Sequence, residues 1–280
     1  MVSKKKLSDL VEKEEVGKDS PFEIQGFELP VEEDKGKVRQ KTYVMDLRVH
    51  SPASLGYLGI GGIDTAPALI RLARVKGIDV IAVTDFYSGH YIDRILAAAK
   101  ETTVTVIPGV VIRCRVKDCD DVTLSCLFPP TFTSEKIQEF LLALEIPTSS
   151  FGDKDHLLEL SFEKILETID LYGGIAMPSR MDKTPHRMKA IPVLVDTYGF
   201  RTFDLAYQDS VKFFKKSWPR GKFHLFSFSS AYALAQVGSR IARIKLPELS
   251  FSALRQLMVR DGQTFVEQAK IEAPGIGNTL

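Results

Sequence analysis

The fold is decided by the stretch Asp46-Leu47-Arg48-Val49-His50-Ser51 together with a second stretch, Ala82-Val83-Thr84-Asp85-Phe86, further along the chain. The first stretch continues the run Tyr43-Val44-Met45 and the second continues Val80-Ile81, and both runs are typical of strands. Between them, residues 65–76 have a helical pattern, with Asp64 placed to cap the first turn and Gly77 placed to end the helix. These features predict a strand, a helix and a second, parallel strand.

The alternation of strands and helices continues along the chain. We expect strands at 43–47, 80–83, 104–107, 175–178, 202–207 and 224–227, a hairpin-like stretch at 110–128, and helices at 90–100, 134–144, 162–172 and 250–260. Pro108-Gly109 is predicted to close the third strand, and Ser134 to cap the helix that follows the hairpin. Because candidate site residues follow several strands, the pattern predicts an α/β fold of the TIM-barrel kind.

The composition is that of a globular chain with almost no net charge. The chain has 280 residues, of which 44% are hydrophobic and 26% charged, enough for one large barrel or two small domains. The net charge of +1 does not favour nucleic acid as a partner. No apolar run could cross a bilayer, and the start of the chain lacks the apolar stretch of a signal peptide. We therefore expect a cytoplasmic protein that does not bind membranes.

Three regions are predicted along the chain. Residues 1–40 are rich in Lys and Glu and form a charged extension, which is either partly disordered or contains a docking helix for a partner protein. Residues 41–265 form the barrel, and residues 266–280 form a C-terminal tail. Within the barrel, the glycine-rich stretch 56–62 lacks a phosphate-loop ending and is predicted to be a flexible loop over the barrel mouth.

Two further patterns have a structural and a functional interpretation. Cys114, Cys119 and Cys126 lack the Cys-x2-Cys pair of a zinc site, so we expect reduced thiols on neighbouring strands. The basic and aromatic stretch 212–223 could hold phosphates and stack bases, or it could form a surface helix that buries its Phe residues. The surface helix is the favoured interpretation.

Five stretches resemble motifs of the PHP (polymerase and histidinol phosphatase) superfamily. The two opening stretches resemble Asp-Leu-His-x-His-Ser and Thr-Asp-His. Residues 106–111 resemble Ile-Pro-Gly-x-Glu, residues 174–182 resemble Gly-Ile-Ala-x-Pro-Ala-His-x-Asp, and residues 229–238 resemble Ser-Asp-Ala-His followed by Ile-Gly. The resemblance spans most of the chain and implies a distorted TIM-like (β/α)7 barrel of PHP type.

In that superfamily these motifs bind a cluster of metal ions, and here most of the ligand side chains are replaced. Of the aligned ligand positions, only His50 is kept. The replaced positions are Arg48, Phe86, Val111, Arg180, Ser230 and Tyr232. Phenylalanine and valine donate no lone pair, and a protonated guanidinium repels a divalent cation. We therefore expect no cofactor, and a divalent metal (Zn, Mn or Fe) only if a reduced site remains active.

The leading hypothesis is a degenerate PHP-domain protein without metal-dependent phosphoesterase activity, acting as a scaffold, a regulator or a binding protein for phosphate or carboxylate. The predicted ligand-binding residues are Arg48, His50, Asp85, Arg180, Ser230 and Tyr232. Equally, Arg48 could pair with Asp85 and fill the cavity as an internal ion pair. The alternatives are a metal-dependent phosphoesterase or nuclease with a reduced metal site, and a nucleic-acid-binding scaffold.

Overall fold

The structure is a computed structural model that describes residues 40–263, so almost all of the predicted extension and the tail lie outside the described residues. The strands are β1 (Lys41–Val49), β2 (Val80–Phe86), β3 (Thr105–Val116), β4 (Cys119–Leu127), β5 (Ile175–Pro178), β6 (Thr202–Asp204), β7 (His224–Phe226) and β8 (Ala242–Leu246). The helices are α1 (Thr65–Val75), α2 (Ile92–Ala99), α3 (Ser134–Ala143), α4 (Phe162–Leu171), α5 (Pro185–Met188), α6 (Ile191–Asp196), α7 (Val211–Ser217) and α8 (Phe251–Leu257).

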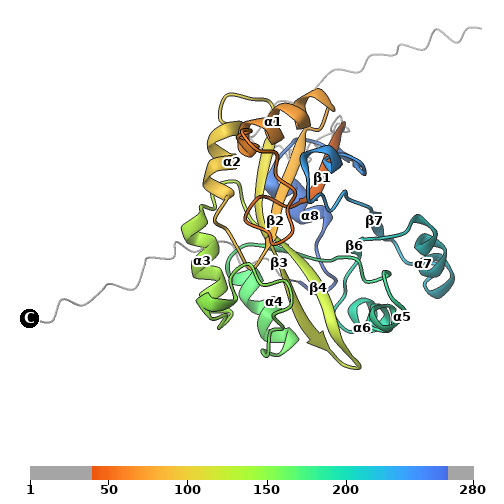
Figure 1. The fold of residues 1–280 in the computed structure, drawn as a ribbon. Coiled ribbons are helices and arrows are strands. Elements are labelled where there is room, and N and C mark those ends of the chain that lie inside the picture. The colour runs from red at the N-terminus through yellow and green to blue at the C-terminus, as the bar shows by residue number, and fades with distance from the viewer. Residues whose placement is uncertain (1–39, 264–280) are drawn as a thin grey trace, which may run out of the picture. The chain divides into compact units, whose positions relative to one another are not determined.

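Six strands form a curled sheet of half-barrel form, in the order β5-β4-β3-β2-β1-β8 (Figure 1). Strands β1, β2 and β3 are parallel, whereas β4, β5 and β8 each run antiparallel to a neighbour. Strands β6 and β7 form a separate parallel pair. The predicted α/β class is confirmed. The regular strand–helix repeat holds only as far as β3, because β3 and β4 form the hairpin expected at 110–128.

Single bridges connect the strand pair to the curled sheet. Ser179, after β5, is bridged to Asp204 at the end of β6, and Val49 of β1 is bridged to Ala231, after β7. The buried carboxylate of Asp46 on β1 accepts hydrogen bonds from the N–H groups of Ser229 (3.1 Å) and Gly238 (2.9 Å). These contacts bring the ends of β1, β5, β6 and β7 together.

Helices α1 and α3 begin where the sequence predicts them, but the capping residue of α3 differs by one position. Asp64 caps α1 by accepting a hydrogen bond from the N–H of Ala66 (3.2 Å). The cap of α3 is Thr133, not Ser134, whose hydroxyl donates instead to the carbonyl of Gly89 (2.7 Å). The prediction of the cap was wrong because two adjacent hydroxyl residues compete for the position, and a tertiary contact decides between them.

The expected end of the third strand at Pro108-Gly109 was also wrong. Strand β3 continues through both residues, and Gly109 is paired with Thr84 on one side and Leu127 on the other. A Cβ at position 109 would lie 2.7 Å from the carbonyl oxygen of Cys126. Gly109 therefore permits close packing of strands rather than a turn.

Apolar residues fill both faces of the sheet. One core cluster lies between the β1–β2 region and helices α1 and α2, and includes Ile81, Val83, Leu69 and Ile95. That side also carries a cluster between β3, β4 and the helices α3 and α4, while Met45, Leu47, Val80 and Ala82 form a cluster on the opposite face. Figure 1 shows α1, α2 and α3 along one side of the sheet and β6, β7 and α7 on the other. No helix within residues 40–263 is long and apolar enough to span a membrane.

The cysteines and the basic, aromatic stretch have the structural roles that the sequence favours. Cys114, Cys119 and Cys126 are buried, free thiols on β3 and β4. Burial raises the pKa of Cys114 well above its usual value, so this thiol stays protonated. In α7, Phe214 is buried while Lys212 is exposed. The surface-helix interpretation is therefore confirmed for α7, where Phe214 is buried and Phe213 partly buried, but not for the whole stretch 212–223.

Candidate anion-binding site

Two arginines share one buried carboxylate where the strand ends meet. A terminal nitrogen (Nη1) of Arg48 lies 3.4 Å from Oδ2 of Asp204, and Nε of Arg180 lies 3.6 Å from the same oxygen. The side chain of Asp204 is fully buried, and that of Arg48 is 6% exposed. We call Arg48, Arg180 and Asp204 the floor cluster. Burial raises the pKa of Asp204, and the two guanidinium groups oppose this shift.

The donors of the floor cluster are only partly used. Arg180 donates one hydrogen bond to the carbonyl of Phe228 (2.9 Å), while Nε of Arg48 is buried and has no hydrogen-bond partner. Both contacts to Asp204 are longer than the roughly 2.7–2.9 Å of a well-formed charge-assisted hydrogen bond. The carboxylate of Asp204 therefore leaves part of the hydrogen-bonding capacity of the two guanidinium groups unused.

A second pair of arginines shares Asp121 at the edge of the same site. Asp121 accepts hydrogen bonds from Nε and Nη2 of Arg113 (3.0 and 2.8 Å) and from Nε and Nη2 of Arg187 (2.7 and 2.9 Å). Burial favours a higher pKa for Asp121, but the hydrogen bonds from Arg187 and Arg113 outweigh it and hold the pKa below its usual value. We call these three residues the rim clamp. Its arginines are largely satisfied by the shared carboxylate.

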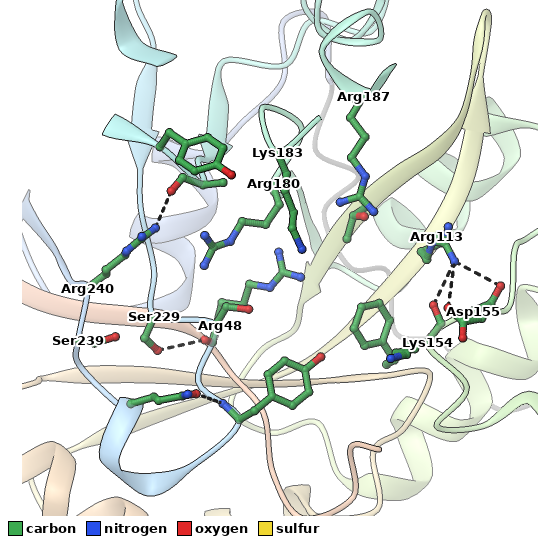
Figure 2. Close-up of a pocket in the computed structure, with 17 residues that line it drawn as sticks. Arg48, Arg113, Lys154, Asp155, Arg180, Lys183, Arg187, Ser229, Ser239 and Arg240 are labelled. Atoms are coloured by element: carbon green, nitrogen blue, oxygen red, sulfur yellow. Dashed lines mark hydrogen bonds and ion pairs between the residues drawn. The ribbon is translucent and has the colours of Figure 1, made fainter. Parts of the chain in front are cut away.

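A cavity of about 870 Å³ lies between the floor cluster and the rim clamp. Figure 2 shows Arg48, Arg180 and Lys183 pointing toward a common region of this cavity. Its basic lining residues are Arg48, Arg113, Lys154, Arg180, Lys183, Arg187 and Arg240. Asp155 is the one acidic residue among its described lining residues. Within residues 40–263, the ammonium groups of Lys154 and Lys183 have no ion-pair partner, so the site has excess positive charge.

His50 is buried beneath the cavity. Its ring stacks on Tyr232 (centroids 4.0 Å apart) and on Phe86 (5.8 Å), both of which line the cavity. Burial, followed by the charges of Arg48 and Arg180, lowers the pKa of His50 well below its usual value, so the ring is neutral. Its Nε2 atom has no hydrogen-bond partner.

Asp85 does not pair with Arg48, so the predicted internal ion pair between them was wrong. Its carboxylate accepts hydrogen bonds from the hydroxyls of Ser51 and Ser54, both at 2.5 Å, and from the N–H of Ser51 (2.8 Å). Asp85 is buried and is not among the cavity's lining residues. The error arose because Asp204, which is distant in the sequence, reaches Arg48 through the β6 bridge.

The other replaced ligand positions separate into two groups. Val111 is fully buried in β3 and does not line the cavity. Ser230 lines it, next to Tyr232. Ser230 (φ 51°) and Arg180 (φ 56°) both have left-handed backbone conformations, which cost a non-glycine residue roughly 1 kcal/mol each. The backbone is therefore strained at two residues whose side chains face the site.

The described residues do not fit the metal cluster of the PHP superfamily. His50 offers one unpartnered nitrogen, but residues 40–263 contain no group of three or more His, Cys, Asp or Glu side chains that could hold a metal. Arg48 and Arg180 already disfavour a proton on His50, and the same charges would repel a divalent cation.

The sequence motifs identify the arginines of this site but not their partners. Arg48, Arg180, Ser230 and Tyr232, together with the replaced position Phe86, line one cavity, while His50 and Asp85 lie beneath it. Missed residues are Asp204, Asp121, Lys183 and Arg240. An aspartate inside an expected buried strand was the available signal for Asp204, because a buried carboxylate requires partners.

Comparisons with known proteins find similar structures but no similar sequence. No family model matches the chain, and no curated protein matches it. Endonuclease Q, solved with a 27-mer duplex carrying an abasic lesion, has a TM-score of 0.56 at 19% identity; the match covers 77% of this chain and 56% of that one. The chain thus spans little more than half the length of this neighbour.

Two further solved structures are similar at comparable lengths. An amidohydrolase from Chromobacterium violaceum, solved with bound sulfate and no metal, has a TM-score of 0.50 at 16% identity, covering 77% of this chain and 97% of that one. A putative metal-dependent phosphoesterase from Bifidobacterium adolescentis has a TM-score of 0.49 at 11% identity, covering 76% and 94%. At these identities, the likeness to Endonuclease Q and the amidohydrolase shows a shared fold.

Proposed function

We propose that the chain is a divergent PHP-type protein that binds a phosphate ester in its basic cavity, with Arg48, Arg180 and Lys183 as the anion ligands. One observation carries the proposal: two guanidinium groups share a single carboxylate at 3.4 and 3.6 Å, beside an ammonium group that has no ion-pair partner within residues 40–263. A phosphate presents several acceptor oxygens, and hydrogen bonds to charged groups contribute about 1.5–3 kcal/mol each.

The strained backbone and the form of the sheet support this proposal. Left-handed conformations at Arg180 and Ser230 are retained at a cost to stability, as is common where side chains must be aimed at a ligand. We also propose that the bridges at Ser179 and Val49 reflect a distorted (β/α)7 barrel, with the cavity at the carboxyl ends of its strands.

A calorimetric titration with inorganic phosphate tests the binding proposal. We expect saturable binding that weakens with ionic strength, and a loss of about tenfold or more in affinity for Arg180→Gln, since one charge-assisted contact is removed. Arg71→Gln, on the exposed face of α1, is the matched control and should bind as the unmodified protein does. Equal affinities for both variants would contradict the proposed ligands.

The second candidate function is a metal-dependent phosphoesterase or nuclease with a reduced metal site. The hydrolase names of the structural neighbours favour this candidate over a non-catalytic scaffold or regulator. The unpartnered Nε2 atom of His50 suits a metal ligand. Zn, Mn or Fe would supply an activated water there, but the remaining ligands would have to come from outside the clusters described.

Elemental analysis and a hydrolysis assay separate the two candidates. Stoichiometric transition metal, together with hydrolysis of bis(p-nitrophenyl) phosphate that a chelator abolishes and His50→Ala removes, would establish the phosphoesterase. Phosphate binding that survives chelation without turnover would establish the binding protein.

The net charge of the chain does not favour nucleic acid as a partner. The structure of Endonuclease Q with a duplex substrate supports such a partner. A phosphodiester is a phosphate ester, so nucleic acid belongs to the ligand class proposed here. A protein partner for the N-terminal extension stays a prediction, because residues 1–39 lie outside the described residues.

A further inference from the structure

A second cavity adjoins the basic one and shares a wall with it. This outer cavity has a volume of about 1010 Å³ and lies between β7 and β8. The residues that line both cavities are Ala206, Tyr207, Ser239 and Arg240. Figure 2 shows Arg240 and Ser239 at one side of the basic cavity. A ligand held at the floor cluster can therefore extend past these residues without leaving the surface of the protein.

The outer cavity differs in chemistry from the basic one. Its lining includes the apolar side chains of Leu205, Val211, Leu225 and Ile241. Its charged lining residues are Arg240, Arg243 and Asp209, so it lacks the strong excess of positive charge found at the floor cluster. A ligand that occupies both cavities would have an anionic end and a less polar end.

Tyr207 stands between the two cavities with its ring accessible. Tyr207 is 54% exposed. Among the large hydrophobic residues of the described chain that are highly exposed, it is the one aromatic residue. An exposed aromatic ring on a cavity wall can stack against a flat ligand.

The backbone that carries Tyr207 is fixed by a buried carboxylate. Asp182 accepts hydrogen bonds from the N–H groups of Ala206 (2.7 Å) and Tyr207 (2.9 Å), and from the hydroxyl of Ser210 (2.7 Å). Arg240 donates to the carbonyl of Ala206 (2.6 Å). The ring is thus presented on a rigid segment, which reduces the entropy lost on stacking.

We propose that the ligand is a phosphate ester of a flat, ring-bearing alcohol, with a nucleoside monophosphate as its simplest form. The phosphate lies at the floor cluster, and the ring stacks on Tyr207 toward the outer cavity. This inference rests on the proposed phosphate binding and adds the class of the esterified group. Stacking on one aromatic side chain raises affinity roughly fivefold to a hundredfold.

Three probes separate the contribution of the ring from that of the phosphate. Inorganic phosphate, ribose 5-phosphate and adenosine 5′-monophosphate are titrated into the protein and into Tyr207→Ala and Tyr207→Phe. We expect the adenosine ester to bind about tenfold more tightly than the ribose ester. Tyr207→Ala should abolish that difference, while Tyr207→Phe, which keeps the ring, should preserve it.

The outcomes distinguish this inference from the proposed function. If phosphate binds but the adenosine ester binds no better than the ribose ester, the ring inference is wrong and phosphate binding stands. If none of the three binds, the proposed function itself is wrong. A 5′-phosphorylated oligonucleotide identifies the source of the ring: tighter binding than the mononucleotide, with the same dependence on Tyr207, assigns it to a nucleic-acid end.

Discussion

The floor cluster and the rim clamp have the same composition, two arginines and one aspartate, yet they differ in how far the arginines are satisfied. At the rim, Asp121 makes four hydrogen bonds of 2.7–3.0 Å to Arg113 and Arg187. At the floor, Asp204 lies 3.4 and 3.6 Å from Arg48 and Arg180, and Nε of Arg48 has no partner.

This difference in hydrogen bonding indicates that the floor cluster and the rim clamp, which carry the same charges, have different roles. Bidentate pairing uses the directional donors of an arginine, so the rim clamp mainly stabilises the fold of β3, β4 and α5. Loose pairing keeps a buried arginine neutralised while its donors remain available. In the floor cluster, Asp204 therefore offsets the cost of burying the arginines, and their unused donors can bind an anion.

The largest effect is expected from Asp204→Asn. The amide keeps the shape of the side chain, and its oxygen can still accept from the N–H of Phe228 (3.0 Å in the native protein), but Arg48 and Arg180 lose their buried counter-charge. Urea denaturation should show a loss of about 3–5 kcal/mol in the free energy of unfolding. Phosphate should restore more stability to this variant than to the native protein, because the anion replaces the missing charge.

An exposed ion pair typically contributes less than about 1 kcal/mol to the free energy of unfolding. A loss of this size in Asp204→Asn would mean that the floor cluster contributes little to stability, and it would contradict the proposed difference from the rim clamp.

Substitutions of Lys183 and Arg187 test the comparison by their effects on phosphate affinity and on stability. Lys183→Gln removes an ammonium group that has no ion-pair partner within residues 40–263, so phosphate affinity should fall about tenfold with little change in stability. Arg187→Gln removes a rim contact, so stability should fall while phosphate affinity changes much less. Titration calorimetry and denaturation of both variants check this reversal. The opposite pattern would place the anion at the rim.

Asp121→Asn is expected to have a smaller effect that depends on pH. Asp121 is 25% exposed, so solvent screening limits the loss of unfolding free energy at pH 7 to about 1 kcal/mol. Its folded pKa is lowered, so its stabilisation is full above the unfolded carboxyl pKa of about 3.9 and is lost as the pH falls through the lower folded value. The deficit of the variant should therefore shrink below about pH 4. A deficit that grows on acidification would contradict this assignment.

The smallest effect, and the one stabilising change, is expected for Ser230→Gly. Glycine adopts the positive φ of this residue without strain, although it also adds entropy to the unfolded chain, so thermal denaturation should show a gain of no more than about 1 kcal/mol. Phosphate binding should persist, because Ser230 is not one of the three proposed cationic ligands. A destabilised variant would show that the Ser230 side chain makes contacts that outweigh the strain.

The sequence predicts the parts of this molecule whose signals are local. Helix α1, with its cap at Asp64, and the parallel strands β1 to β3 follow from apolar periodicity and capping residues. Arg48 and Arg180 were placed at one site by the motif resemblance, and the structure shows them on one cavity.

The pairing of these arginines could not be predicted in the same way. Arg48 and Asp204 are 156 residues apart and meet through single bridges between β5, β6 and the neighbouring strands. The sequence offers Asp85 as one possible partner for Arg48, whereas in the structure the hydroxyls of Ser51 and Ser54 donate to that carboxylate. Nor does any local pattern mark Tyr207, whose exposure depends on the fixed segment after β6.

The most direct test of the account is the binding of inorganic phosphate to protein that has been stripped of metal by a chelator, with the metal content of the same sample measured. The floor cluster predicts saturable binding at metal levels far below one ion per chain. Binding that appears only after Zn, Mn or Fe is added would contradict it and would assign the cavity to a metal-dependent enzyme.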